Sequence, residues 1–188
     1  MAAALEPLLS RLNGFDALVL DANLSEASLR FLAERLSVPL YADPVSAAKA
    51  PKLLPILPRL AALKPNRLEA ELLSGVPIRS REDLDWAADR LLETGLGRVF
   101  ISLGSRGVYC ADEKERLLQP CCPARAVNTT GAGDAFMAGL VWSHLRGLGL
   151  AETARAAQAA AAVAVEGAET VNPALSEETL TAKTREAI

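Results

Sequence analysis

The chain has 188 residues, of which 51% are hydrophobic and 23% charged, and its 20 Lys and Arg against 23 Asp and Glu give a net charge of −3. Such a composition is that of a globular protein long enough for one α/β domain or a large part of a two-domain enzyme. The charge balance argues against a nucleic-acid partner, and no apolar run is long enough to span a membrane.

Cysteine usage indicates a reducing compartment. The three cysteines, Cys110, Cys121 and Cys122, are odd in number and lack the spacing of a metal site. The N-terminus has neither the basic region nor the apolar core of a signal peptide, so we expect a cytoplasmic protein. The adjacent pair Cys121-Cys122 is either a redox switch or an inert pair near a strand, and ordinary frequencies favour the inert pair.

In chain order, short apolar runs alternate with amphipathic stretches up to the middle of the chain. Ser25 is a helix cap, and Ser80 with Asp83 three residues on is close to a capping box. Predicted strands cover residues 17–21, 38–42, 59–63 and 98–103. Predicted helices cover residues 4–12, 25–36, 46–57 (interrupted by proline), 67–73 and 80–94.

The rhythm changes after residue 103. Residues 108–111 and 116–119 predict a hairpin, and residues 120–127 an extended segment. Two helices follow over 135–146 and 152–166, and a last one begins at Ser176. The helix over 152–166 is so rich in alanine that we expect it to pack closely against the preceding one.

Alternating strands and helices predict a single α/β domain over residues 1–188, with a mostly parallel open sheet flanked by helices and a C-terminal β-hairpin. Ligands of such sheets bind outside the C-terminal ends of the strands. Polar or glycine-rich features stand at five predicted strand ends: Asp21, Asp43, residues 64–66, 104–107 and 128–134. We therefore expect a ligand site at this edge.

The turn over residues 128–134, Asn-Thr-Thr-Gly-Ala-Gly-Asp, runs into a helix. Free N–H groups and the positive dipole end make a helix N-terminus a seat for phosphate or a developing oxyanion. A carboxylate there, Asp134, suits a base that takes a proton from a hydroxyl attacking phosphorus. A helix cap is an equally good reading of this segment alone.

Two weaker motifs precede that turn. Asn66 and Glu69 stand three residues apart on a first helical turn, where both could reach a hydrated Mg²⁺ or could form a capping box, and alone the box is favoured. Ser102, Gly104 and Gly107 follow a buried strand, where the backbone could approach a nucleotide phosphate or form a hairpin turn.

Taken together and in this order, residues 64–69, 102–107 and 128–136 resemble the ribokinase-like (PfkB) family of sugar and nucleoside kinases. The resemblance runs from about Asp16 to Asn172, and residues 21–25, 43–46 and 171–176 are most similar to its pseudouridine kinase branch. It implies a ribokinase-like fold and an ATP-dependent transfer of phosphate to a primary hydroxyl.

The resemblance also implies roles for the glycine turn. Asp134 would be the base, and the amides of Gly131, Ala132 and Gly133 would form the anion hole for the transferring phosphoryl group. This fits the chemistry, because phosphoryl transfer needs positioning and charge neutralisation more than covalent help.

It further implies how ATP and its cations are held. Asn66 and Glu69 would bind Mg²⁺ through water. The remaining cofactor-binding residues would be Ser102, Gly104, Gly107, Thr130 and Gln158, the last beside the adenine. Carbonyls near Asn128 and Thr130, with others around residues 165–172, would correspond to the family's monovalent-cation site, which would take K⁺.

Two departures from the family matter. Asn128 stands where aspartate is usual, which removes one charge near the cation site. The N-terminal substrate and lid segment of the family is absent before Asp16, so we expect a fragment, an isoform or one module of something larger. Apolar surface left exposed there predicts self-association into a homo-oligomer.

Two hypotheses of different classes follow. One is a kinase that converts pseudouridine to pseudouridine 5′-phosphate, with another ribokinase-like sugar kinase as the alternative. The other is a catalytically silent nucleotide-binding remnant.

Overall fold

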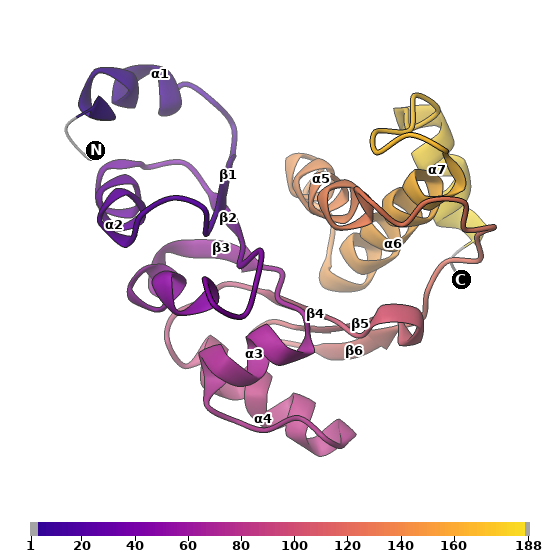
Figure 1. Cartoon of the computed structure of the whole chain (residues 1–188), viewed down its shortest axis with the longest axis horizontal. Coiled ribbons are helices and arrows are strands. Elements are labelled where there is room, and N and C mark those ends of the chain that lie inside the picture. The colour runs from indigo at the N-terminus through magenta and orange to yellow at the C-terminus, as the bar shows by residue number, and fades with distance from the viewer. Residues whose placement is uncertain (1–3, 187–188) are drawn as a thin grey trace. The chain divides into compact units, whose positions relative to one another are not determined.

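The computed structural model describes residues 4–186. The chain forms two compact units, one of Met1–Ser102 with Ala111–Arg116 and one of Leu103–Cys110 with Leu117–Ile188. Six strands form one sheet in the order β1-β2-β3-β4-β5-β6, labelled in Figure 1. The mostly parallel sheet flanked by helices is confirmed, and the single domain over residues 1–188 stays a prediction.

Four parallel strands form the sheet of the first unit. They are β1 (Leu18–Asp21), β2 (Leu40–Asp43), β3 (Leu60–Leu63) and β4 (Val99–Ser102). All four lie where the alternation of apolar runs predicted them. Because they run in parallel, their C-terminal ends meet at one edge, where Asp21 is the register partner of Asp43.

Helices with well-formed caps connect these strands. They are α2 (Glu26–Arg35), α3 (Arg67–Ser74) and α4 (Arg81–Leu92). The Ser25 side chain accepts from the backbone N–H of Ser28, and Ser80 with Asp83 forms a complete capping box. Both caps were predicted from the sequence, and they satisfy N–H groups that a helix leaves without partners.

Two predicted helices are wholly or largely 3₁₀-helical in the structure. The stretch predicted as a helix over 46–57 is a 3₁₀-helix, η3 (Ala50–Arg59), with Pro55 and Pro58 inside it. Proline has no N–H to donate and clashes with the preceding turn of an α-helix, so Pro55 and Pro58 disfavour α-helical geometry in this stretch. Residues 4–12 likewise contain the 3₁₀-helix η2 (Glu6–Leu8) and only a single α-helical turn, α1 (Leu9–Leu12).

The later part of the chain holds the hairpin and three helices. The two strands of the hairpin, β5 (Val108–Ala111) and β6 (Arg116–Gln119), lie where they were predicted. A 3₁₀ turn, η4 (Gly104–Arg106), precedes them. The helices are α5 (Ala132–Leu145), α6 (Leu150–Glu166) and α7 (Glu177–Glu186). Helix α5 begins three residues before its predicted start at residue 135, because the last residues of the glycine turn already have helical geometry.

The helices of the second unit, labelled in Figure 1, pack through small side chains, most of them alanine. A Cβ added to Gly139 of α5 would lie 2.7 Å from Cα of Ala157 on α6, so the two backbones touch. The buried cluster that joins α5, α6 and α7 consists of Ala135, Ala159, Ala160, Ala164 and Leu180. The close packing predicted for the alanine-rich helix is confirmed.

Among residues 4–186 we find no helix with both the length and the apolar character that a membrane span requires.

Candidate active site

The strand-end edge of the first unit brings several predicted site residues together. Asn66, which follows β3, pairs in parallel with Ser102 at the end of β4. Ser102 donates to the carbonyl of Pro65 through its backbone N–H, at 2.9 Å, and through its hydroxyl, at 3.4 Å. Ser102 and the Asn66 segment therefore lie side by side, as their positions at neighbouring strand ends predicted.

Asn66 and Glu69 form a reciprocal capping box at the start of α3. The Glu69 N–H donates to Asn66 Oδ1 at 2.9 Å, and the Asn66 N–H donates to Glu69 Oε2 at 2.8 Å. The capping box, which was the favoured interpretation of this motif alone, is thus present. It leaves Glu69 Oε1 without a hydrogen-bond partner from residues 4–186, and so available to a ligand.

Burial is the main influence on the Glu69 carboxyl. The residue is 3% exposed, and burial raises the pKa of Glu69 above its ordinary value. The Asn66 hydrogen bond and the Lys64 charge lower that pKa, while the Asp43 charge raises it further. A buried acid with a raised pKa beside charged partners is a frequent feature of functional sites.

The donor set at this edge fits a divalent cation that keeps most of its waters. Glu69 Oε1 and the Asn66 amide are oxygen-rich but few, and no group of three or more His, Cys, Asp or Glu gathers as a metal cage within residues 4–186. Mg²⁺ keeps most of its waters and takes further oxygens from substrate phosphates. The residues present therefore fit a hydrated Mg²⁺ shared with a nucleotide, and not a site built from protein ligands alone.

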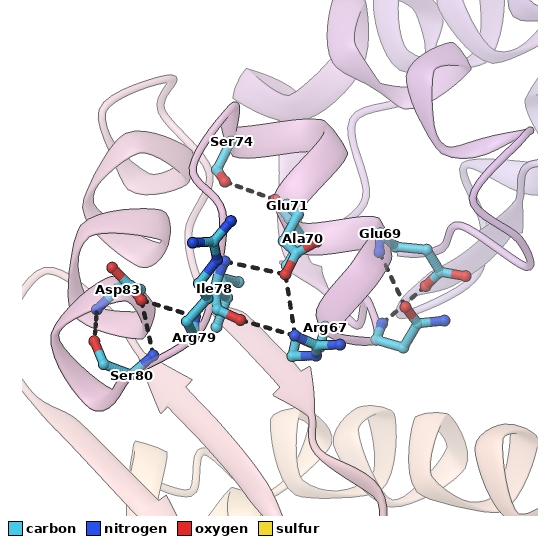
Figure 2. A network of polar contacts seen from close by, with 10 residues as sticks. Arg67, Glu69, Ala70, Glu71, Ser74, Ile78, Arg79, Ser80 and Asp83 are labelled. Carbon is cyan, nitrogen blue, oxygen red and sulfur yellow. Dashed lines mark hydrogen bonds and ion pairs between the residues drawn. The ribbon is translucent and has the colours of Figure 1, made fainter.

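Sequence reasoning missed the network that holds the start of α3, drawn in Figure 2. Arg67 donates to the carbonyl of Ile78 at 2.8 Å and pairs with Glu71, which in turn accepts from the Ile78 N–H at 3.0 Å. The spacing of Arg67 and Glu71 by four residues was the available signal. These bonds tie the first turn of α3 to the loop that leads into α4.

The glycine turn of the second unit lies at the N-terminus of α5, as predicted. Gly131 is the residue before the helix and has φ +86°, a left-handed conformation that glycine adopts without strain. A Cβ at this position would lie 2.1 Å from the carbonyl oxygen of Thr170. Glycine is therefore required here both by the backbone angle and by the space.

Asp134 stands in the first turn of α5 and is exposed. Its carboxylate accepts no hydrogen bond from any of residues 4–186, so it does not cap the helix through a side-chain bond. The backbone N–H groups of Gly133 and Asp134 stand where a helix has no internal acceptors, and the dipole there is positive. The arrangement can hold an anion next to a free carboxylate.

The C-terminal end of α6 and the loop after it close on the glycine turn. Asn128 donates its side-chain amide to the Ala168 carbonyl at 3.1 Å, and its Oδ1 accepts from the Thr130 N–H at 2.9 Å. The N–H groups of Val127 and Asn128 both donate to the Val165 carbonyl. The structure thus brings Asn128, Thr130 and this loop together, with the Asn128 side chain engaged in holding the turn; their role toward K⁺ stays a prediction.

The remaining predicted cofactor residues lie in the second unit. Gly104 has φ +62° with open space around its Cα, whereas a Cβ on Gly107 would lie 2.1 Å from the Gln119 carbonyl oxygen. Packing thus explains Gly107, whereas a side chain at Gly104 would have room, and the Gly104 carbonyl accepts from the Gly107 N–H at 3.1 Å. Gln158 is buried in α6, at 7% exposure. What these three residues bind stays a prediction.

The three thiols differ in their surroundings. Burial raises the pKa of Cys110 and of Cys122, whereas Cys121 is exposed and its Sγ lies 3.3 Å from the Gly104 carbonyl oxygen. All three are free cysteines. That the adjacent pair is inert stays a prediction.

Comparison with known proteins identifies the family. The pfkB family carbohydrate kinase model matches residues 9–177. The chain is 40% identical over 161 residues to the pseudouridine kinase of Escherichia coli strain K12, covering 85% of this chain and 51% of that protein. Among solved structures, a candidate sugar kinase from Clostridium perfringens superimposes with a TM-score of 0.88 at 28% identity, covering 97% of this chain and 58% of that one.

The ribokinase of Thermotoga maritima also superimposes, with a TM-score of 0.80 at 28% identity over 94% of this chain and 59% of that one. The chain thus spans about half the length of the curated relative and somewhat more of these two solved chains. With the matched region covering most of its residues, the chain belongs to the pfkB family of carbohydrate kinases.

Proposed function

We propose that the protein of this chain is an ATP-dependent kinase that phosphorylates the primary hydroxyl of a nucleoside or sugar, with pseudouridine as the acceptor and pseudouridine 5′-phosphate as the product. The observation that carries the proposal is the glycine turn at α5. There a free, exposed carboxylate stands beside unpaired helix N–H groups, on a backbone that only glycine can adopt. Similarity to the Escherichia coli pseudouridine kinase supports the choice of acceptor.

Each residue of the turn has one task in this reaction. Asp134 takes the proton of the acceptor hydroxyl as its oxygen attacks the γ-phosphorus of ATP. The bond from the γ-phosphorus to the bridging oxygen breaks, and ADP leaves with the electron pair. The amides of Gly131, Ala132 and Gly133 stabilise the charge on the phosphoryl oxygens in flight.

The cations Mg²⁺ and K⁺ would neutralise negative charge, while residues 131–134 carry out the proton and phosphoryl transfer. Glu69, through Oε1, and Asn66 hold Mg²⁺ by way of its waters, and Mg²⁺ when bound offsets the negative charge of the phosphates. Ser102, Gly104, Gly107, Thr130 and Gln158 line the nucleotide. A monovalent cation, K⁺, is held by carbonyls of the turn and of the loop that Asn128 closes.

One observation favours a second candidate function. The chain covers 51% of the length of the pseudouridine kinase that it resembles, and acceptor recognition can depend on parts outside the matched half. A chain with this nucleotide-binding part alone would bind ATP without transferring phosphate. Another ribokinase-like sugar kinase is the alternative within the kinase class.

The test is transfer of phosphate from ATP with Mg²⁺ to pseudouridine, with uridine and ribose in parallel. Asp134→Asn keeps the shape of the side chain and removes the base, so we expect the rate to fall by roughly 100- to 10,000-fold. Glu178→Gln is the matched control, because Glu178 is also an exposed acid in the first turn of a helix of the second unit.

The outcomes separate the candidates. Transfer to pseudouridine that Asp134→Asn abolishes and Glu178→Gln leaves intact supports the proposal. Transfer to ribose but not to pseudouridine favours the sugar kinase. Binding of ATP without transfer to any acceptor favours the silent nucleotide-binding protein.

A further inference from the structure

The C-terminal end of α6 anchors two other segments of the second unit. An α-helix leaves its last four carbonyl groups without N–H partners of its own. In α6 the Val165 carbonyl accepts from the N–H groups of residues 127–128, which lead into the glycine turn. The Val163 carbonyl accepts from the side-chain amide of Asn172 at 2.6 Å. The glycine turn and the loop that contains Asn172 are therefore tied to the same helix end.

The Asn172 side chain occupies a space that glycine at position 167 leaves open. A Cβ added to Gly167 would lie 2.6 Å from Cγ and 2.8 Å from Cβ of Asn172. Gly167 has φ −87°, an angle open to any residue, so what the position requires is the missing side chain and not a special backbone. Asn172 Oδ1 also accepts from the Ala174 N–H at 3.0 Å. Both ends of the Asn172 amide are thus bonded, in a place that Gly167 makes for it.

The loop that Asn172 holds meets the start of α5 at two points, one on each side of Asn172 in the sequence. Two residues before it, the Thr170 carbonyl oxygen lies 2.1 Å from the place of a Cβ on Gly131. Three residues after it, Leu175 packs against the buried cluster that includes Ala135. The Leu175 N–H donates to the Asn172 carbonyl at 3.0 Å, which joins the second contact to the same residue.

These two contacts enclose the residues that the proposed reaction uses. The amides of residues 131–133 would hold the transferring phosphoryl group, and Asp134 would be the base. Catalysis by positioned groups is sensitive to small displacements, and a misplacement of about 1 Å can lower a rate roughly 100-fold. A residue that fixes the loop can therefore act on the rate through the geometry of the turn.

We propose that Asn172 is a positioning residue for phosphate transfer, which holds the glycine turn in its reactive shape through the contacts of Thr170 and Leu175. The inference rests on the proposed function, since it takes residues 131–134 as the catalytic turn. Without the Asn172 amide, the Val163 carbonyl loses its donor and the loop loses its bond to α6. The turn then no longer has a fixed direction for its N–H groups and its carboxylate.

The experiment measures the steady-state kinetics of phosphate transfer from ATP with Mg²⁺ to pseudouridine. We expect Asn172→Ala to lower kcat by roughly 10- to 100-fold. KM for ATP and for pseudouridine should change by less than about twofold, because an interaction made only in the transition state lowers kcat and kcat/KM equally. Hydrogen exchange of the amides of residues 131–134 should become faster, since local opening of the turn costs less.

Two further variants test the bond to Val163 in other ways. Gly167→Ala retains Asn172 but displaces its side chain, so it should lower kcat to a similar extent. Asn172→Asp keeps the acceptor for the Ala174 N–H and removes the donor to Val163, and it should be as slow as Asn172→Ala. If Asn172→Ala does not fold, these two variants carry the test. Gly149→Ala is the control for the glycine, because nothing lies within 4 Å of its added Cβ.

Asn13→Ala is the matched control for a purely structural role. Asn13 Nδ2 donates to the Arg35 carbonyl at the end of α2, at 3.3 Å, and its Oδ1 accepts from the Ser37 N–H at 2.8 Å. Asn13 thus makes in the first unit the same two kinds of bond that Asn172 makes in the second. Both alanine variants should unfold at lower urea concentration, but only Asn172→Ala should lose kcat.

The results that overturn the inference are distinct from those that overturn the proposed function. Wild-type kcat in Asn172→Ala or Asn172→Asp, or an equal loss of kcat in Asn13→Ala, refutes the positioning role while the kinase proposal stands. If the wild-type chain transfers phosphate to no acceptor, the proposed function fails and the role of Asn172 fails with it.

Discussion

The predicted site residues have opposite surroundings at the strand-end edge of the first unit and at the glycine turn of the second. At the edge, Asn66, Glu69 and Asp43 all have hydrogen-bond or ion-pair partners within the chain. At the turn, Asp134 is exposed and its carboxylate accepts no hydrogen bond from the described residues. A residue engaged in a cap or an ion pair has a structural explanation. Its role toward a ligand must be inferred from the polar atoms that the cap or ion pair does not use. Asp134 has no hydrogen-bonded structural role among the described residues, and its role as the base stays a prediction.

Of the substitutions that test this difference between the two regions, Gly131→Ala should have the largest effect on stability and on phosphate transfer. The left-handed backbone costs about 1–2 kcal/mol for any residue with a Cβ, and here the Cβ would also overlap the Thr170 carbonyl oxygen at 2.1 Å. We expect a loss of unfolding free energy above that range, together with loss of phosphate transfer, measured by urea denaturation and by the pseudouridine assay.

Gly147→Ala is the matched control for that variant. Gly147 has φ +65°, and no atom lies within 4 Å of the place that an alanine methyl group would take, so only the backbone cost of about 1–2 kcal/mol should remain. Equal losses in the two variants would contradict the claim that the Thr170 contact shapes the turn.

A smaller effect is expected from removing the cap at the edge. Asn66→Ala and Ser80→Ala each remove the side chain of an N-terminal capping box, and each should lower the unfolding free energy by about 1 kcal/mol. Asn66→Ala alone should also weaken binding of ATP with Mg²⁺, by roughly five- to tenfold for one lost hydrogen bond. The same ATP affinity in both variants would mean that Asn66 is a cap and nothing more.

The smallest effect concerns a carboxylate whose role is structural. The N–H groups of Arg79 and Ser80 bond to Asp83 Oδ2, and these bonds lower the pKa of Asp83 below its ordinary value (Figure 2). A lowered pKa in the folded state means that the charged form stabilises the fold at neutral pH. This contribution is lost as the pH falls through the folded-state value. Asp83→Asn should therefore be less stable than wild type at neutral pH and equal to it in strong acid; urea midpoints at both pH values measure the difference.

Local signals predicted most of the first unit. Ser25, and Ser80 with Asp83, cap helices because a cap depends on residues three positions apart. The four strands followed from apolar runs. The 3₁₀-helix η3 was predicted as a helix interrupted by proline, but its 3₁₀ geometry was not, since apolar periodicity does not separate 3₁₀ from α geometry when Pro55 and Pro58 interrupt it.

Contacts between distant residues could not be predicted in the same way. The ion pair of Lys64 with Asp43 depends on the register of β2 and β3, and the fit of Gly131 against Thr170 depends on how the loop after α6 returns. The motif that contains Gly131 could be found from the sequence, but the reason for its glycine could not. The paired state of Lys64 leaves no signal in one sequence beyond a lysine at a strand end.

The contact of Gly139 with Ala157 has a consequence for the position of Asp134. Asp134 precedes Gly139 by five residues on α5, about 7.5 Å along the helix axis. At Gly139 the helix rests on the backbone of α6, with no side chain between them that could adopt another rotamer. The position of the Asp134 Cα along the helix axis is therefore set by direct contact between the main chains of α5 and α6.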